Sequence, residues 1–436
     1  MKETIIQFGS GNFLRGFIED FINTLLDKGL YDGKIVVVQP TRGGKAHIIN
    51  EQKGKYNLVL QSDEGSEIRQ INSVSRGVDP YSDYEAYLSL AEISDMRFII
   101  SNTTESGIAF DENCSFSHRP AASFPGKLTQ LLYRRYEKAM KGFVILPCEL
   151  IDSNADKLKQ CVIKYARLWS LGDDFIKWIN EENVFCNTLV DRIVSGYPKD
   201  RALELEKSIG YNDKLLDTAE KYHLWVVQGN FENELPLKRA GINVIWTNDV
   251  TPYKKMKVRI LNGSHTLLAF VSLLLDKETV YDSLCDNDLT LLLEKSLNSY
   301  ILPCLPNDSQ HEDFAKAVIK RFANRYIKHY WSSIALNSVS KWSVRVLPTV
   351  KDFIALYGTL PKELLFSLAC LIYYYKKNRV CDSEYAVKFI KENSVKAILS
   401  NDRLWGDNLS AFTDFIGEAV DRVDEDVREA FKWAMS

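Results

Sequence analysis

Hydrophobic residues in the first part of the chain form short unbroken runs that alternate with helical patterns. Residues 4–8 are a β-branched run that stops at Gly9, and apolar residues then recur at helical spacing over residues 13–26. Similar runs follow at residues 35–38, 98–101 and 143–147, with a predicted helix over residues 127–141. Unbroken apolar strands are typical of a parallel sheet that is covered on both faces, so the alternation predicts a βαβ architecture.

Two further segments show a different pattern. Residues 56–60 and 67–71 alternate between apolar and polar positions, as half-exposed antiparallel strands do. They lie between the second and third predicted strands of the parallel sheet. We therefore expect them to form an inserted hairpin.

From about residue 251 strand signals fade and helical periodicity dominates. The predicted helices cover residues 282–298, 312–325, 362–377 and 409–433. We place a domain boundary near residue 250. The prediction is an α/β domain over residues 1–250, followed by a mostly α-helical domain over residues 251–436.

Charge and composition narrow the class of protein. The 436 residues include 55 Lys and Arg against 58 Asp and Glu, a net charge of −3, so no general attraction to nucleic acid or to an anionic membrane is expected. No apolar run approaches the roughly 20 residues that span a bilayer, and the first residues lack the pattern of a secretory signal. The eight cysteines are scattered, without the spacing of metal ligands. We expect a cytoplasmic protein with reduced thiols and no metal.

The first candidate for chemistry is Gly9-Ser10-Gly11, directly after the first predicted strand. A dinucleotide-binding fold places its pyrophosphate here, because glycine permits a close backbone approach and the next helix offers free N–H groups. Leu14 stands where the third glycine of that motif belongs, so the motif alone fits a tight turn equally well. Gln39 follows the second strand in place of the usual acidic residue, and Arg42 nearby permits a 2′-phosphate, which leaves NAD and NADP both open.

The second candidate is the segment that begins with Thr251 and Pro252, a cap and first residue typical of a helix. On an α-helix, at about 100° per residue, Lys257, Asn262 and His265 lie within an arc of roughly 140°. The positive end of the helix dipole and the neighbouring basic residues disfavour an ammonium ion at Lys257, which suits a general acid and base. Taken alone, the same residues also fit a solvated first turn followed by a core histidine.

A third candidate is Asn187, within the run Phe185-Cys186-Asn187-Thr188-Leu189-Val190-Asp191-Arg192-Ile193. A neutral amide donor suits the stabilisation of an alkoxide or a carbonyl oxygen. By itself an asparagine at such a place is equally a turn or cap residue.

Several motifs occur together and in order. They are the GxGxFxRGF pattern from Gly9 to Phe17, Ser101-Asn102-Thr103-Thr104-Glu105-Ser106-Gly107, the NTLVDRI run, and a lysine followed by asparagine and histidine five and eight residues later. In this combination the chain resembles the long-chain polyol dehydrogenase family, typified by mannitol dehydrogenase. Within it the likeness is strongest to the branch that acts on hexuronates, in motifs such as Pro147-Cys148-Glu149-Leu150-Ile151-Asp152 and Tyr326-Ile327-Lys328-His329.

The resemblance implies a Rossmann-type N-terminal domain that binds NAD, a helical C-terminal domain, and a metal-independent site in a cleft between them. It implies reversible reduction of D-tagaturonate to D-altronate with NADH. Lys257 is then the acid and base, Asn187 and Asn262 hold the reacting oxygen, and His265 positions the substrate hydroxyls or Lys257. The implied cofactor contacts are Phe8, Gly9, Gly11, Asn12, Phe13, Arg15, Thr103 and Glu105.

One departure from the mannitol-type pattern concerns the substrate. Mannitol-type members carry Asp-Gln and then an arginine where this chain has Lys328, His329 and Ser333. A carboxylate substrate favours added cationic donors, so we predict that Lys328, His329 and Lys341 bind the acid end of a hexuronate. An exposed basic helix explains these residues equally well.

Two other readings stay open on the sequence alone. Reduction of the epimeric D-fructuronate to D-mannonate, or of another ketose, uses the same active-site framework. A non-catalytic nucleotide-binding redox sensor is the alternative from another class. The joint presence of Lys257, Asn262, His265 and Asn187 argues against the sensor.

Overall fold

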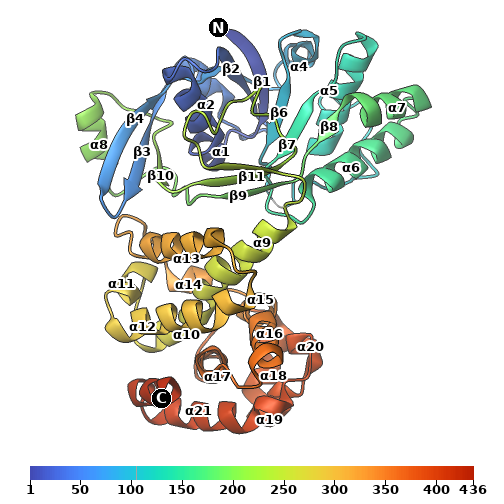
Figure 1. Ribbon diagram of the computed structural model, residues 1–436. Helices are drawn as coiled ribbons and strands as arrows, with labels where there is room; N and C mark the ends of the chain where they lie inside the picture. Colours follow the sequence, from blue (N-terminus) through green and yellow to red (C-terminus); the bar gives the residue numbers. More distant parts are fainter. Residues whose placement is uncertain (105) are drawn as a thin grey trace. The chain divides into compact units, whose positions relative to one another are not determined.

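The computed structural model describes residues 1–104 and 106–436. The chain divides into two compact units, Met1–Thr251 and Pro252–Ser436 (Figure 1). Within the described residues, no helix combines the length and the apolar character needed to cross a membrane.

The main sheet of the N-terminal unit is parallel throughout, as the apolar runs predict. Its strands are β1 (Lys2–Phe8), β2 (Gly33–Val38), β5 (Val74–Val78), β6 (Phe98–Ser101), β7 (Val144–Pro147) and β8 (Val184–Phe185). Their order in space is β5-β2-β1-β6-β7-β8. The chain order therefore reverses between β1 and β6, and in open α/β sheets ligands bind where the order reverses, at the carboxyl ends of the strands.

Successive residues of β1 build two separate cores, because strand side chains alternate between the faces of a sheet. Ile5 packs with α2 (Ile18–Asp27) and the strands of the inserted segments. Ile6 packs on the other face. The helices of that face are α4 (Tyr84–Leu88), α5 (Phe124–Glu137), α6 (Asn154–Leu168) and α7 (Asp173–Glu182).

The predicted helix over residues 13–26 is wrong in one respect, because the structure breaks it in two. α1 (Asn12–Arg15) ends at Gly16, and α2 begins at Ile18. A Cβ atom on Gly16 would lie 2.9 Å from both methyl carbons of Val194. The close approach of that neighbouring segment interrupts a pattern that the apolar spacing alone would continue.

The inserted hairpin is present, as β3 (Tyr56–Ser62) and β4 (Gly65–Ile71) pair antiparallel. β3 is buried along almost its whole length, although its pattern predicts half exposure. The reason is that its second face is covered too, because Val59 packs with Leu205 and Leu216. β10 (Asp217–Glu220) pairs with its other edge. A separate sheet joins β9 (Thr188–Asp191), β11 (Leu224–Gln228) and β12 (Val244–Thr247), and the short helices α3 (Ala46–Glu51) and α8 (Ala202–Ile209) complete the unit.

The C-terminal unit is built from helices, as expected. It begins with α9 (Thr251–Lys257), a π-helical segment (Val258–Asn262) and α10 (Gly263–Leu274). α10 packs on α17 (Lys362–Lys377), whose side chains are buried over most of its length. The remaining helices are α11 (Val280–Leu284), α12 (Asn287–Lys295), α13 (Ser309–Phe322), α14 (Trp331–Ile334), α15 (Ser338–Arg345), α16 (Leu347–Tyr357), α18 (Glu384–Glu392), α19 (Val395–Leu399), α20 (Asp402–Trp405), α21 (Thr413–Glu425) and α22 (Val427–Met435).

His223, just before β11, couples the stability of the N-terminal unit to pH. Its Nε2 accepts a hydrogen bond from the backbone N–H of Asn243 at 3.0 Å, and its Nδ1 lies 3.1 Å from the carbonyl oxygen of Lys221. Only a neutral ring with its hydrogen on Nδ1 satisfies both contacts. Burial, together with the nearby Arg192 guanidinium, lowers the pKa of His223 to about 4.

We expect acid to destabilise the protein through His223. The unfolded chain binds this proton near pH 6.5 and the folded chain only near pH 4, so this contribution is complete above pH 6.5 and is lost as the pH falls. At about 1.36 kcal/mol per pH unit, the loss between pH 7 and pH 5 is about 2 kcal/mol. Urea unfolding at both pH values measures it. In His223→Gln the free energy of unfolding should change less between the two pH values. His118→Gln, a control at an exposed position, should behave as the wild type does. Equal pH dependence in all three proteins would contradict the assignment.

Candidate active site

The Gly9–Gly11 turn lies at the reversal point of the main sheet. Gly9 has φ of +127°, and a Cβ atom there would lie 2.7 Å from the carbonyl oxygen of Asn102, which follows β6. No other residue fits this position without strain. Gly11 is exposed, and a Cβ atom on it would meet nothing within 4 Å. The turn thus leaves an open backbone surface beside two strand ends, which suits the approach of a pyrophosphate.

The buried side chain of Arg15 stabilises the Gly9–Gly11 turn. Its guanidinium donates hydrogen bonds to the carbonyl oxygen of Ser10 at 2.9 Å and to Asn12 Oδ1 at 2.7 Å, and lies 3.4 Å from Asp217 Oδ2. The side chain is 1 % exposed. This geometry gives Arg15 and Asn12 a role in shaping the turn, and the cofactor contact that the resemblance implies for both stays a prediction.

The two phenylalanines predicted at the cofactor site point into the protein. Phe8 is fully buried and its ring packs against Tyr87 and Phe124, so it can offer only its backbone to a ligand. Phe13 is half-buried and stacks on Phe17 with ring centroids 5.0 Å apart. Both side chains serve the hydrophobic core.

Thr103 follows β6 and is held by a residue that the sequence analysis did not single out. The backbone N–H and the hydroxyl of Thr103 both donate to Glu149 Oε1 at 3.0 Å, and Ser101 donates to Glu149 Oε2 at 3.0 Å. Burial raises the pKa of the Glu149 carboxyl, while these hydrogen bonds lower it. Glu149 lies in the Pro147–Asp152 motif, which was the available signal. The predicted cofactor residue Glu105 lies outside the described residues.

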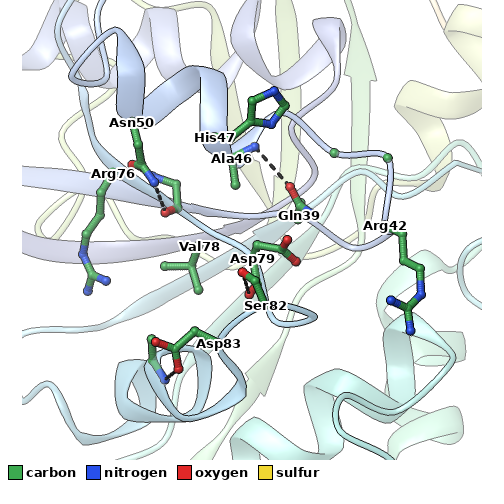
Figure 2. A pocket seen from close by; sticks show the side chains of 14 residues that line it. Gln39, Arg42, Ala46, His47, Asn50, Arg76, Val78, Asp79, Ser82 and Asp83 are labelled. Carbon is green, nitrogen blue, oxygen red and sulfur yellow. Dashed lines mark hydrogen bonds between the residues drawn. The ribbon is translucent and has the colours of Figure 1, made fainter.

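A cavity of about 530 Å³ opens beyond the end of β2. Figure 2 shows residues from the carboxyl ends of β2 and β5 around it, with Gln39 Oε1 accepting from the backbone of Ala46 at 3.2 Å. The Arg42 guanidinium lies over the Tyr81 ring at 4.8 Å. The Arg76 guanidinium is paired with the Glu3 carboxylate.

Two carboxylates complete the lining of this cavity. Among the described residues, neither Asp79 nor Asp83 makes an ion pair; both accept hydrogen bonds from nearby backbone N–H groups. The cavity therefore offers acceptors for hydroxyl groups, and its lining carries charges of both signs.

Asn187 lies between β8 and β9, and its amide is fully engaged. Nδ2 donates to Asp156 Oδ2 at 2.8 Å and to Gln228 Oε1 at 3.1 Å, while Oδ1 accepts from the backbone of Ala155 at 3.0 Å. The residue is 9 % exposed. To hold a reacting oxygen, as the sequence suggested, this amide would have to release Asp156 or Gln228.

The π-helical segment brings Lys257 and Asn262 closer than the sequence predicts. In an α-helix, residues five positions apart are rotated by roughly 140°. Here Gly263 N–H donates to Val258 O, the i→i−5 pairing of a π-helix. The widened turn reduces that rotation, so Asn262 lies closer to the side of Lys257 than on a regular α-helix. Among the described residues no side-chain hydrogen bond engages Asn262, which leaves its amide able to donate to a ligand.

His265 follows one turn later on α10 and is 8 % exposed. Its ring packs against Phe322, His329 and Trp331, with centroids 4.3, 4.8 and 6.4 Å away. Burial and nearby positive charge keep the pKa of His265 well below 6.5, so the ring is neutral. One nitrogen bonds the backbone of Leu261, and within the described part of the chain Nε2 has no partner. Nε2 is therefore an acceptor suited to a substrate hydroxyl.

The three residues predicted to bind a carboxylate have different surroundings in the structure. His329 lies beside His265, and burial lowers its pKa as well. Lys328 is exposed. Lys341 donates to the carbonyl oxygen of Ile334 at 2.9 Å, so its ammonium is already used within the helical unit. Arg321 and Arg345, which sequence reasoning missed, are the cations whose charges reach His265.

A parallel sheet with an open glycine turn, followed by a helical unit carrying Lys257, Asn262 and His265, defines a two-domain dehydrogenase. The model of the mannitol dehydrogenase Rossmann domain matches residues 3–239, and that of the mannitol dehydrogenase C-terminal domain matches residues 249–426. The chain belongs to the mannitol dehydrogenase family.

Similar sequences and structures agree with this assignment. Altronate oxidoreductase of Bacillus subtilis (strain 168) is 43 % identical over 97 % of this chain and 91 % of its own length. That of Enterobacter sp. (strain 638) is also 43 % identical, over 86 % of this chain and 80 % of its own.

Two solved structures share the fold. A D-sorbitol dehydrogenase in substrate-free form has a TM-score of 0.89 at 24 % identity and covers 99 % of this chain and 95 % of its own. Mannitol 2-dehydrogenase of Pseudomonas fluorescens, in a complex with NAD and D-mannitol, has a TM-score of 0.74 at 21 % identity and covers 100 % and 94 %. In the described part of the chain, no group of three or more His, Cys, Asp or Glu side chains is arranged to hold a metal.

Proposed function

We propose that this protein interconverts D-tagaturonate and D-altronate with NADH and NAD, as a step of hexuronate catabolism. The observation that carries the proposal is the 43 % identity to altronate oxidoreductase over nearly the whole chain. The row of Lys257, Asn262 and His265 supports it, because a ketone reductase needs a proton donor and a second donor at one oxygen.

In this proposal the residues of the helical unit handle the proton and the substrate. The bound dinucleotide supplies a hydride to the ketone carbon. Lys257 gives a proton to the carbonyl oxygen, and the Asn262 amide donates a hydrogen bond to the same oxygen as charge develops on it. His265 Nε2 accepts from a substrate hydroxyl and so fixes the chain of the sugar. In the oxidation of altronate the same lysine takes the proton back.

The N-terminal unit fits a dinucleotide. The exposed Gly11 leaves room for a pyrophosphate, and the cavity at the end of β2 has room for the ribose that follows it. The Asp79 and Asp83 carboxylates in that cavity would repel a 2′-phosphate, whereas they can accept hydrogen bonds from the hydroxyls of NAD. Arg42 in the same lining would attract that phosphate, so the charges around the cavity leave NAD and NADP open, and NAD is proposed from the resemblance to the family.

The test is the consumption of NADH by the purified protein with D-tagaturonate, beside D-fructuronate, D-fructose and an NADPH control. We expect kcat/KM to be highest for D-tagaturonate with NADH. A preference for D-fructuronate would move the proposal to the D-mannonate reaction and keep the same site. No turnover with any of these substrates would favour a non-catalytic nucleotide-binding role.

A further inference from the structure

Arg345, the last residue of α15, is a partly buried cation without an anionic partner among the described residues. Burial lowers the pKa of its guanidinium. In the part of the chain that the structure describes, its one side-chain hydrogen bond goes to Thr266 Oγ1, at a long 3.4 Å. Within the described residues no carboxylate pairs with it. Removing a cation from water without a counter-charge is unfavourable, so this position is suited to an anion that arrives from outside.

Other polar groups lie near the Arg345 guanidinium. Thr266 is the neighbour of His265, so the Arg345 guanidinium reaches α10 beside the unpartnered His265 Nε2. Arg321, 8 % exposed near the end of α13, and Arg345 both act on the charge of His265, and Arg321 acts on His329 as well. The charges of two arginines from different helices therefore reach His265, whose ring lies against that of His329.

We propose that Arg345 binds the carboxylate of the substrate and thereby determines specificity for a sugar acid over a neutral sugar, with Arg321 and His329 beside it. This inference rests on the proposed function and adds the residue that binds the carboxylate of the substrate. The planar guanidinium presents paired N–H donors that match the two oxygens of a carboxylate. His265 Nε2 then accepts from a hydroxyl on the same substrate.

Lys341 provides a matched comparison on the same helix. It lies one turn before Arg345 and has a similar charge, but its ammonium donates to the Ile334 carbonyl and lies near Asp382. An ammonium that already donates within the protein has fewer N–H groups left for a ligand. Replacement of Lys341 should therefore leave the choice between acid and neutral substrates unchanged.

The experiment compares D-tagaturonate with D-tagatose, which carries a CH₂OH group in place of the carboxylate. We expect Arg345→Gln to lower kcat/KM for D-tagaturonate by about 10- to 100-fold, the loss of one or two charged hydrogen bonds, and to leave kcat/KM for D-tagatose within about threefold. Arg345→Lys should recover part of the loss. Lys341→Gln is the control. A parallel fall for both substrates, or no fall, would overturn the proposal.

Binding without turnover separates this inference from the proposed function. Calorimetry compares D-altronate with D-altritol, its neutral counterpart, in the wild type and in Arg345→Gln, with thermal melting as the check on folding. Loss of D-altronate binding in the folded variant supports the subsite even if the wild type reduces no ketone. Equal binding in both proteins, or no preference of the wild type for D-altronate over D-altritol, overturns it.

Discussion

Lys257→Ala should lower kcat for the reduction of D-tagaturonate by at least about 100-fold, because loss of a general acid removes a factor of roughly 10²–10⁴. The variant should keep its affinity for NADH, since Lys257 belongs to the helical unit and the glycine turn to the N-terminal one. Steady-state kinetics with varied NADH and varied ketone measures both. Thermal melting should show an unchanged fold, because the Lys257 side chain is only partly buried.

Lys255→Ala is the matched control for this substitution. It removes the same charge two residues earlier on α9, from an exposed position. We expect its kcat to stay within about twofold of the wild type, as surface substitutions usually have small effects. If Lys257→Ala also stayed within a few-fold, the proton donor would have to be another group, and the proposed mechanism would be wrong.

Gly9→Ala should impair both the fold and the cofactor site. The new methyl group would meet the Asn102 carbonyl oxygen at 2.7 Å, at a φ of +127° that an alanine does not adopt without strain. Such backbone strain alone is about 1–3 kcal/mol. We expect a lower melting temperature and a KM for NADH raised by more than tenfold.

Gly11→Ala separates these two effects. Gly11 has φ of −74° and open space around it, so alanine fits and stability should change by less than about 0.5 kcal/mol. The methyl group would nevertheless stand in the proposed path of the dinucleotide, and KM for NADH should rise by about tenfold. Gly417→Ala, in α21 with nothing within 4 Å, should change neither KM nor kcat. An unchanged KM in Gly11→Ala would place the cofactor elsewhere.

Hydrophobic patterning was enough to predict the architecture, since unbroken apolar runs can be satisfied only by strands covered on both faces. The pattern gave a wrong prediction where a residue distant in sequence contacts the segment. Val194 approaches Gly16 and splits the first helix, and β10 covers the outer edge of β3. Contacts of this kind leave no trace in the local periodicity of the segment that they alter.

The candidate site could be predicted at the level of motifs but not of hydrogen-bond partners. Lys257, Asn262 and His265 lie together on one helix, as their spacing suggested. Asn187 has the same chemical character as Asn262, yet its amide is used by Asp156 and Gln228. Arg345 stands out only when its lack of a carboxylate partner is visible, because one arginine in a basic segment looks like any other.

The π-helical turn between Lys257 and Asn262 amounts to one additional residue within an otherwise α-helical rod. At about 100° per residue, a regular α-helix would turn Asn262 roughly 140° from Lys257 at a spacing of five, but only about 40° at a spacing of four. Deleting a single residue between them would therefore let a regular helix keep the row of three side chains. The spacing of five and eight residues is thus inseparable from this local widening. A one-residue gap in this stretch among related chains would thus mark the loss of the widened turn, while the three side chains could keep their common side.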